Sequence, residues 1–137
     1  MDPTKVIPRR ILMIDDEEDF LELASFQFRK RGHQVVTAIN CETGLNLIRT
    51  VPLDVVFLDM RMPHVDGVET LRRIRAMKKD LPVIVVTAHA SDEMIQKVEE
   101  LGISAVFYKS SNLSNLQAVM DKALNSTGDS APTPPSA

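Results

Sequence analysis

Five short apolar runs, separated by longer amphipathic segments, constrain the fold of this chain more than any other feature. The runs are rich in β-branched residues and continuous rather than alternating, which is typical of strands covered on both faces. Strands that alternate with helices predict a parallel sheet with helices on both of its faces. The expected strands are ILMID (11–15), HQVVTA (33–38), DVVFLD (54–59), PVIVVTA (82–88) and SAVFYK (104–109).

The segments between the runs carry apolar residues at helical spacing. Gly32 and Gly102 follow the first and the fourth of these segments, and glycine commonly ends a helix. Ser91 can cap the start of the fourth helix. The expected helices span about Glu17–Arg31, Cys41–Val51, Val65–Lys78, Ser91–Leu101 and Asn112–Leu124.

The length of 137 residues suits one domain. We expect an N-terminal extension at 1–9, a folded domain at 10–125, and a tail at 126–137. The tail sequence STGDSAPTPPSA is rich in Pro, Ser and Thr and has no large apolar residue to anchor it. It therefore predicts a disordered tail or the start of a linker.

Composition excludes several classes of protein. The formal net charge of -3 argues against direct nucleic-acid binding by this segment. No apolar run approaches the length of a membrane span, so we expect no membrane insertion. A single cysteine, Cys41, rules out an intrachain disulfide, and the start of the chain lacks the apolar stretch of a secretory signal. A cytoplasmic location fits these features. Separately, we expect His33 to be a surface or loop residue.

Polar residues follow or end four of the five expected strands. In a doubly wound sheet, ligands bind at the carboxyl ends of the strands, where the strand order reverses. The first and third strands flank this point, so we expect Asp15, Asp16 and Asp59 to meet in one cleft. Thr87 ends the fourth strand and is followed by Ala88, and Lys109 ends the fifth.

Carboxylates held this close repel one another, and a hard divalent cation is the usual remedy. Mg²⁺ takes oxygen ligands and keeps several waters, which leaves room for a phosphoryl oxygen. Lys109 would add a positive charge and Thr87 a hydroxyl donor. Together these groups could stabilise charge on a phosphoryl group during its transfer.

The motifs MIDDEEDF, VVFLDMRMPHVDG, VIVVTAHA and AVFYKS closely resemble the receiver domain of two-component response regulators. The match covers about Arg10 to Leu124. The resemblance implies an α/β, flavodoxin-like (βα)5 fold with a doubly wound five-stranded parallel sheet in the order 2-1-3-4-5. It also implies that Asp59 accepts a phosphoryl group from a phosphohistidine on a sensor histidine kinase or a histidine phosphotransfer protein. A downstream protein or a fused output domain would then respond.

The resemblance also implies a role for each acid. Asp16 and Asp59 would bind Mg²⁺ through their carboxylates, and Asp15 would act through water or help to hold the site. The backbone carbonyl of Arg61 would be the remaining protein ligand. Such a domain is a regulatory phosphoacceptor rather than an enzyme, although it assists its own phosphorylation and dephosphorylation.

The same resemblance assigns the switch. Lys109 would pair with Asp59 before the transfer and with the phosphoryl oxygens after it. The Thr87 hydroxyl would swing toward the new phosphate, with Ala88 beside it. Arg61 and His89 lie two places after Asp59 and Thr87, where side chains border the path of a hydrolytic water. They could tune dephosphorylation, or they could be exposed loop side chains without a role.

The loop after the third strand carries two residues with a physical role at the turn. Pro63 would stiffen it, and Gly67 would allow a tight backbone before the next helix. His64 is assigned no role.

Two positions depart from the family pattern. Ser110 replaces the proline that usually follows the lysine, and a cis peptide before a non-proline residue costs about 3 kcal/mol. We therefore expect a trans Lys109–Ser110 peptide or else a strained loop. Val106 occupies the position of the aromatic switch residue, with Phe107 facing the opposite side of the strand. A movement led by Thr87, or a shift of the fourth helix, is then the expected switch.

Two alternatives remain. The departures favour a degenerate receiver that acts as a phosphorylation-independent protein-interaction module, although the intact Asp15, Asp16, Asp59, Thr87 and Lys109 oppose it. A Mg²⁺-dependent phosphatase would need a further acid near its nucleophile. The residue two places after Asp59 is Arg61, a base, which disfavours that class.

Overall fold

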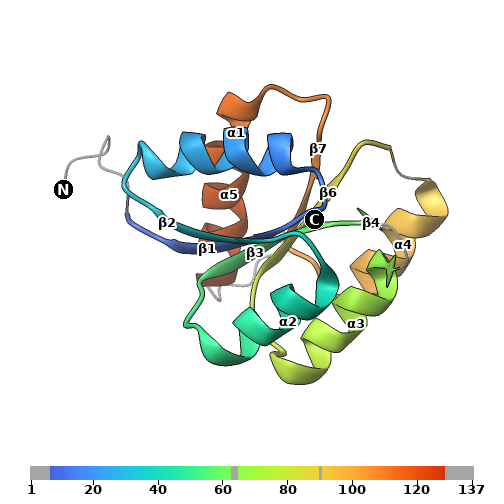
Figure 1. The fold of residues 1–137 in the computed structure, drawn as a ribbon. Helices are drawn as coiled ribbons and strands as arrows, with labels where there is room; N and C mark the ends of the chain where they lie inside the picture. The colour runs from blue at the N-terminus through green and yellow to red at the C-terminus, as the bar shows by residue number, and fades with distance from the viewer. Residues whose placement is uncertain (1–6, 63–64, 90, 129–137) are drawn as a thin grey trace.

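The computed structural model describes residues 7–62, 65–89 and 91–128, and a five-stranded parallel sheet lies at its centre (Figure 1). Along the sheet the order is β2-β1-β3-β6-β7. Counted along the chain within this sheet, the order is 2-1-3-4-5, so the flavodoxin-like fold expected from the sequence is confirmed. The strands are β1 (Arg10–Ile14), β2 (Gln34–Ala38), β3 (Val55–Asp59), β6 (Val83–Thr87) and β7 (Ala105–Tyr108).

Helices cover both faces of the sheet (Figure 1). One face carries α1 (Glu18–Arg29) and α5 (Leu116–Gly128). The other carries α2 (Cys41–Thr50), α3 (Gly67–Met77) and α4 (Asp92–Leu101). Among the described residues, none of the helices combines the length and the apolar character needed to cross a bilayer.

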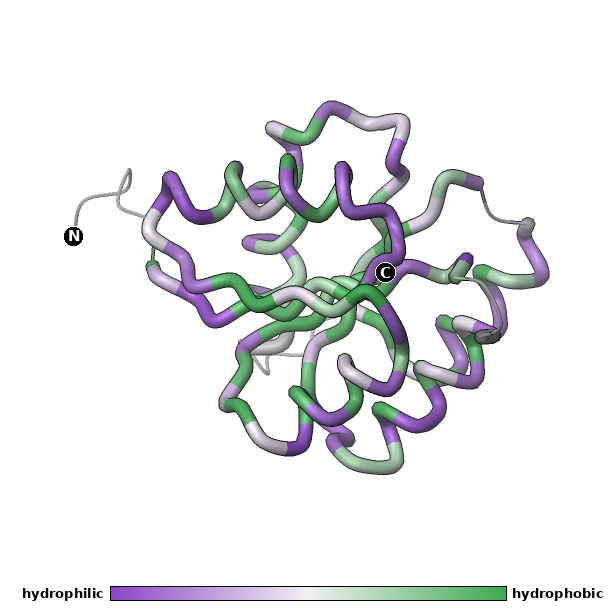
Figure 2. Tube along the Cα trace, viewed as in Figure 1, coloured by the Kyte–Doolittle hydropathy of each residue, from purple (hydrophilic) through white to green (hydrophobic). Residues whose placement is uncertain are grey.

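Strand alternation divides the buried side chains into two cores. Ile11 and Met13 of β1 pack against the α1 and α5 side, whereas Leu12 and Ile14 pack against α2, α3 and α4. Figure 2 shows hydrophobic residues concentrated in the central strands. Full burial of a side chain of this size contributes about 1.5–3 kcal/mol. The apolar runs of the sequence are therefore continuous because both faces of each central strand are covered.

The helix ends follow the expected signals. The Met94 N–H donates to Ser91 Oγ over 3.1 Å, which confirms the cap of α4. Asn40 and Asp66 cap α2 and α3 in the same way. Gly32 and Gly102 follow α1 and α4 with φ of 96° and 95°, a conformation that glycine adopts without strain.

The loop after β3 contains a short hairpin that periodicity did not predict. Two-residue strands β4 (Arg61–Met62) and β5 (Val65–Asp66) pair antiparallel, so α3 begins at Gly67 rather than near residue 65. A Cβ at Gly67 would lie 2.7 Å from the Met60 Cα, so glycine is required at this close approach. Pro63 and His64 lie outside the described residues.

The last helix also differs from expectation. A 3-10 turn, η1 (Leu113–Asn115), precedes α5, and α5 continues to Gly128. The chain is therefore still helical for three residues beyond the boundary expected at 125. The remainder of the expected tail, 129–137, lies outside the described residues.

The expectation of a surface position for His33 is wrong, because its side chain is buried with 4% exposed. Its Nδ1 accepts a hydrogen bond from the Arg9 N–H over 2.9 Å. Its Nε2 lies 2.8 Å from Gln117 Oε1 and, since Nδ1 accepts, is the donor in this contact. His33 thus joins the segment before β1 to the start of α5. This contact spans 84 residues, which local sequence patterns do not reveal.

Candidate functional site

The carboxyl edge of the sheet brings together the acids and the lysine that the sequence singled out. Asp15 directly follows β1, Asp59 is the last residue of β3, and Lys109 directly follows β7. β1 and β3 are neighbours with parallel register, so their ends lie side by side. The distant sequence segments therefore form one cleft.

Asp15, Asp16 and Asp59 form a carboxylate cluster. Each offers an oxygen, and these oxygens all lie within 4.8 Å of one another. Asp15 and Asp59 are buried, with 2% and 3% of their surfaces exposed, whereas Asp16 is partly exposed. Asp15 Oδ2 is buried and pairs with the Lys109 ammonium at 2.8 Å. An oxygen-rich cluster of three carboxylates fits a hard divalent cation.

Asp59 is held in an environment that resists ionisation. Burial raises the pKa of its carboxyl to about 7, and the nearby Asp15 charge acts in the same direction. The Arg61 N–H donates to Asp59 Oδ1 over 3.2 Å and, with the charge of Lys109, partly offsets this effect. A cation beside Asp59 would favour its charged form.

Lys109 lies closer to Asp15 than to the expected partner, Asp59. Its Nζ is 2.8 Å from Asp15 Oδ2 and 3.7 Å from Asp59 Oδ2. It also donates to Glu17 Oε1 and lies 4.8 Å from the centre of the Phe20 ring. Burial lowers the pKa of Lys109, but the hydrogen bonds and charges of the surrounding acids outweigh burial and raise it.

Glu17 is therefore a site residue that the sequence reasoning missed. The run Asp-Asp-Glu-Glu-Asp at 15–19 held the signal, since it continues past the expected acidic pair. Whether an acid just beyond the pair belongs to the site or to the first turn of the helix depends on its contacts in the folded chain.

Thr87 is buried at the end of β6, and its hydroxyl is engaged with the following loop. It donates to the His89 carbonyl over 2.9 Å and accepts from the His89 N–H over 3.2 Å. Ala88 and His89 are exposed. The structure thus places Thr87 one strand away from Asp59, with its hydroxyl directed to the loop backbone.

The two departures from the family pattern have simple structural outcomes. The Lys109–Ser110 peptide is trans, as expected. Val106 is half-buried on the α3–α4 side of β7, and Phe107 is buried on the opposite side. Tyr108 is 40% exposed. The expected placement of Val106 and Phe107 on opposite sides of the strand is confirmed.

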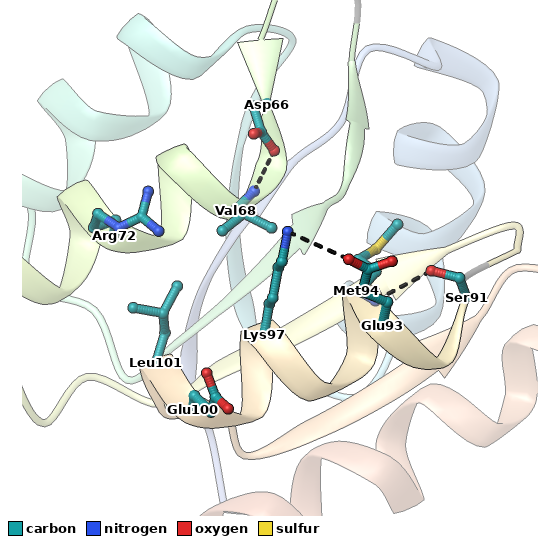
Figure 3. A pocket seen from close by; sticks show the side chains of 9 residues that line it. All are labelled: Asp66, Val68, Arg72, Ser91, Glu93, Met94, Lys97, Glu100 and Leu101. Carbon is teal, nitrogen blue, oxygen red and sulfur yellow. Dashed lines mark hydrogen bonds and ion pairs between the residues drawn. The ribbon is translucent and has the colours of Figure 1, made fainter.

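A separate groove lies between α3 and α4 (Figure 3), and none of the three clustered acids lines it. Its volume is about 570 Å³. Lys97 spans part of it and reaches Glu93 at 4.0 Å. Only Val98 of α4 is fully buried. A helix with so few buried side chains can shift at low cost.

Comparison with known proteins agrees with this architecture. A family model described as "Response regulator receiver domain" matches residues 11–121. Sporulation initiation phosphotransferase F of Bacillus subtilis (strain 168) is 32% identical over 115 residues, which is 84% of this chain and 93% of that protein. Regulatory protein AtoC of Escherichia coli (strain K12) is 33% identical over 115 residues. That match covers 84% of this chain and only 25% of AtoC.

Solved structures share the fold. The crystal structure of a response regulator receiver domain protein (CheY-like) from Methanospirillum hungatei JF-1 has a TM-score of 0.85 and 23% sequence identity. It covers 91% of this chain and 100% of that one.

Proposed function

This chain belongs to the response regulator receiver domain family, and from that premise we propose that Asp59 is its phosphoacceptor. The observation that carries the proposal is the position of Asp59. It is a buried carboxylate at a strand end, within 4.8 Å of two further acids, with Lys109 Nζ 3.7 Å from its Oδ2. The donor would be a phosphohistidine on a sensor histidine kinase or a histidine phosphotransfer protein, and the domain would act in the cytoplasm.

Asp15, Asp16 and Asp59 would hold Mg²⁺, with the Arg61 carbonyl as a further ligand. The bound cation would lower the repulsion among the acids and offset the charge of the phosphoryl oxygens. An Asp59 oxygen forms the new bond to phosphorus while the phosphorus–nitrogen bond breaks. The bonding electrons remain on the imidazole nitrogen, which takes up a proton. Lys109 stabilises the charge on the phosphoryl group.

Thr87 would convert this chemistry into a change of surface. Its hydroxyl would exchange the His89 carbonyl for a phosphoryl oxygen, so the β6–α4 loop would move toward the site. The weakly anchored α4 would follow, and the face formed by α4, β7 and α5 would change its affinity for a partner. Val106 has no ring to rotate, so the loop and α4 carry the response.

The partner that reads this surface would be a separate protein or a fused output domain. Both arrangements have a parallel among the relatives, since the match spans 93% of one of them and 25% of another. An interaction module independent of phosphorylation is not favoured, because Asp15, Asp16, Asp59, Thr87 and Lys109 are all present and all lie at the carboxyl edge of the sheet.

Incubation with Mg²⁺ and acetyl phosphate should add one phosphoryl group to the protein. Intact mass spectrometry measures the addition, and peptide mapping after borohydride reduction locates it. We expect Asp59 to carry the label. A sample without Mg²⁺ is the control and should remain largely unlabelled. Efficient labelling without any divalent cation, or a protein that stays unlabelled with it, would contradict the proposal.

Arg61→Ala should shorten the half-life of the acyl phosphate. Arg61 is exposed and its backbone N–H donates to Asp59 Oδ1, so its side chain would be near enough to pair with phosphoryl oxygens and obstruct water. Loss of an exposed charge contact of this kind corresponds to a change of about two- to five-fold in the half-life. Decay of labelled protein, followed by phosphate release, measures it. Arg49→Ala, an exposed change on α2, should leave the half-life unaltered. An unaltered half-life for Arg61→Ala would make the side chain a bystander.

A further inference from the structure

Lys109 is held on the α1 side of the cleft. Its ammonium contacts Asp15 Oδ2 at 2.8 Å and donates to Glu17 Oε1, and the Phe20 ring centre lies 4.8 Å away. Glu17 and Phe20 lie at the start of α1, and Asp15 lies in the short turn between β1 and α1. Asp59 Oδ2 is more distant, at 3.7 Å. The ammonium has three donors, and its two closest acceptors, Asp15 and Glu17, hold it away from Asp59.

Glu17 is in an unusual place for this contact. It is the N-cap residue of α1, where a side chain ordinarily accepts a hydrogen bond from the first turn. The Glu17 side chain makes no such bond. Its carboxylate accepts from Lys109 instead, across 92 residues of sequence. The helix thus lacks a side-chain cap, and the residue at that position connects α1 to the end of β7.

We propose that Glu17 is a positioning residue that holds Lys109 away from Asp59 and competes with the phosphoryl group for the lysine. The inference rests on the proposed function of Asp59, and it adds a residue to that site. To move toward a phosphoryl oxygen on Asp59, the Lys109 ammonium has to move away from Glu17, which weakens its hydrogen bond to that carboxylate. Glu17 therefore weakens binding of the phosphoryl group and slows its transfer.

The exposure of Glu17 sets the size of this effect. Its side chain is 62% exposed, whereas that of Lys109 is 13% exposed. Water can therefore replace the lysine at Glu17 when the contact breaks. An ion pair with one exposed partner corresponds to a change in affinity of about two- to five-fold. Glu17 is thus a modest, reversible restraint, and Lys109 retains Asp15 as a partner throughout.

Release of Lys109 also has a consequence for the fold. The Glu17 contact ties the segment after β7 to the start of α1. Breaking it loosens this connection whenever Asp59 is phosphorylated. Phosphorylation would then be sensed at the start of α1 as well as at the β6–α4 loop.

Beryllofluoride, a non-covalent mimic of the phosphoryl group, tests the competition. With saturating Mg²⁺, Glu17→Gln should bind it about two- to five-fold more tightly than the wild type. Glu18→Gln makes the same change of charge one residue further along, at an exposed position in the first turn of α1. It should bind the mimic as the wild type does. Binding is measured by titration, with amide NMR spectra as the readout.

A second readout examines the contact itself, without metal or phosphodonor. The ε-methylene resonance of Lys109 should shift in Glu17→Gln and not in Glu18→Gln. Unchanged beryllofluoride affinity in Glu17→Gln, or an equal gain in Glu18→Gln, would overturn the proposal. A wild-type protein that binds no beryllofluoride and accepts no phosphoryl group would instead contradict the proposed function. The two failures are therefore distinguishable.

Discussion

Asp59→Asn should reduce phosphoryl labelling from acetyl phosphate to background. The amide replaces the nucleophilic oxygen and cannot supply a full negative charge to a cation, so both the bond-forming atom and a ligand are lost. Removal of a nucleophile typically lowers the rate by several orders of magnitude. Because Asp59 is 3% exposed and asparagine has nearly the same shape, the fold should persist.

Intact mass after incubation with Mg²⁺ and acetyl phosphate measures this loss. Asp92→Asn provides the matched control, because Asp92 is exposed in the first turn of α4 and lies outside the carboxylate cluster. It should be labelled as the wild type is. Labelling of Asp59→Asn at the wild-type rate would move the acceptor to another residue and refute the proposed site.

The metal-free protein should lose stability as the pH rises toward neutral, and Asp59→Asn should remove that loss. Burial and Asp15 raise the pKa of Asp59 from 3.8 to about 7 in the folded state. The folded state therefore holds the proton more tightly than the unfolded state. The stability contributed by this tighter proton binding is fully present below the pKa of Asp59 in the unfolded state. It is lost as the pH rises through the pKa of Asp59 in the folded state. Above that range a charged carboxylate remains buried beside Asp15.

A shift of this size corresponds to at most about 4 kcal/mol, and relaxation of the site and water penetration reduce the expected effect to about 1–3 kcal/mol. Asp59→Asn keeps a neutral group at every pH. We expect the two metal-free proteins to be similar in stability at about pH 4 and the variant to be more stable at about pH 8. Urea unfolding followed by circular dichroism measures the difference.

At neutral pH, Mg²⁺ should make the wild type more stable than Asp59→Asn, the reverse of the order without metal. A cation binds the deprotonated Asp59, so it should stabilise the wild type more than Asp59→Asn and should compete with protons below about pH 7. Identical pH profiles for the two metal-free proteins would show that Asp59 titrates normally. An equal gain on adding Mg²⁺ would show that Asp59 is not a ligand.

The sequence was sufficient for the sheet and for the main acids of the site. Apolar runs such as Val55–Asp59 are covered on both faces, and continuous β-branched runs are the direct signature of that burial. Once parallel strands are predicted, their carboxyl ends must share one edge. This is why the convergence of Asp15 and Asp59 could be expected from the sequence alone.

Other features depended on contacts between distant segments. The β4–β5 hairpin is too short to leave a periodic pattern, so helix α3 was expected two residues early. His33 has no neighbouring sequence signal for burial, because Arg9 and Gln117 provide its partners. Lys109 was expected at the site, yet its preference for Asp15 and Glu17 over Asp59 depends on differences of about an ångström.

The sequence by itself determined which residues end the strands, because hydrophobic patterning is a local property of neighbouring residues. It thereby determined the fold, the cleft and the chemical type of its groups. Only the tertiary structure decided how those groups are partnered, how deeply Asp59 is buried, and that Glu17 belongs with Lys109. Ion pairing and burial vary steeply with distance and solvent access, and the contacts of Lys109 with residues at the end of β1 and the start of α1 set both.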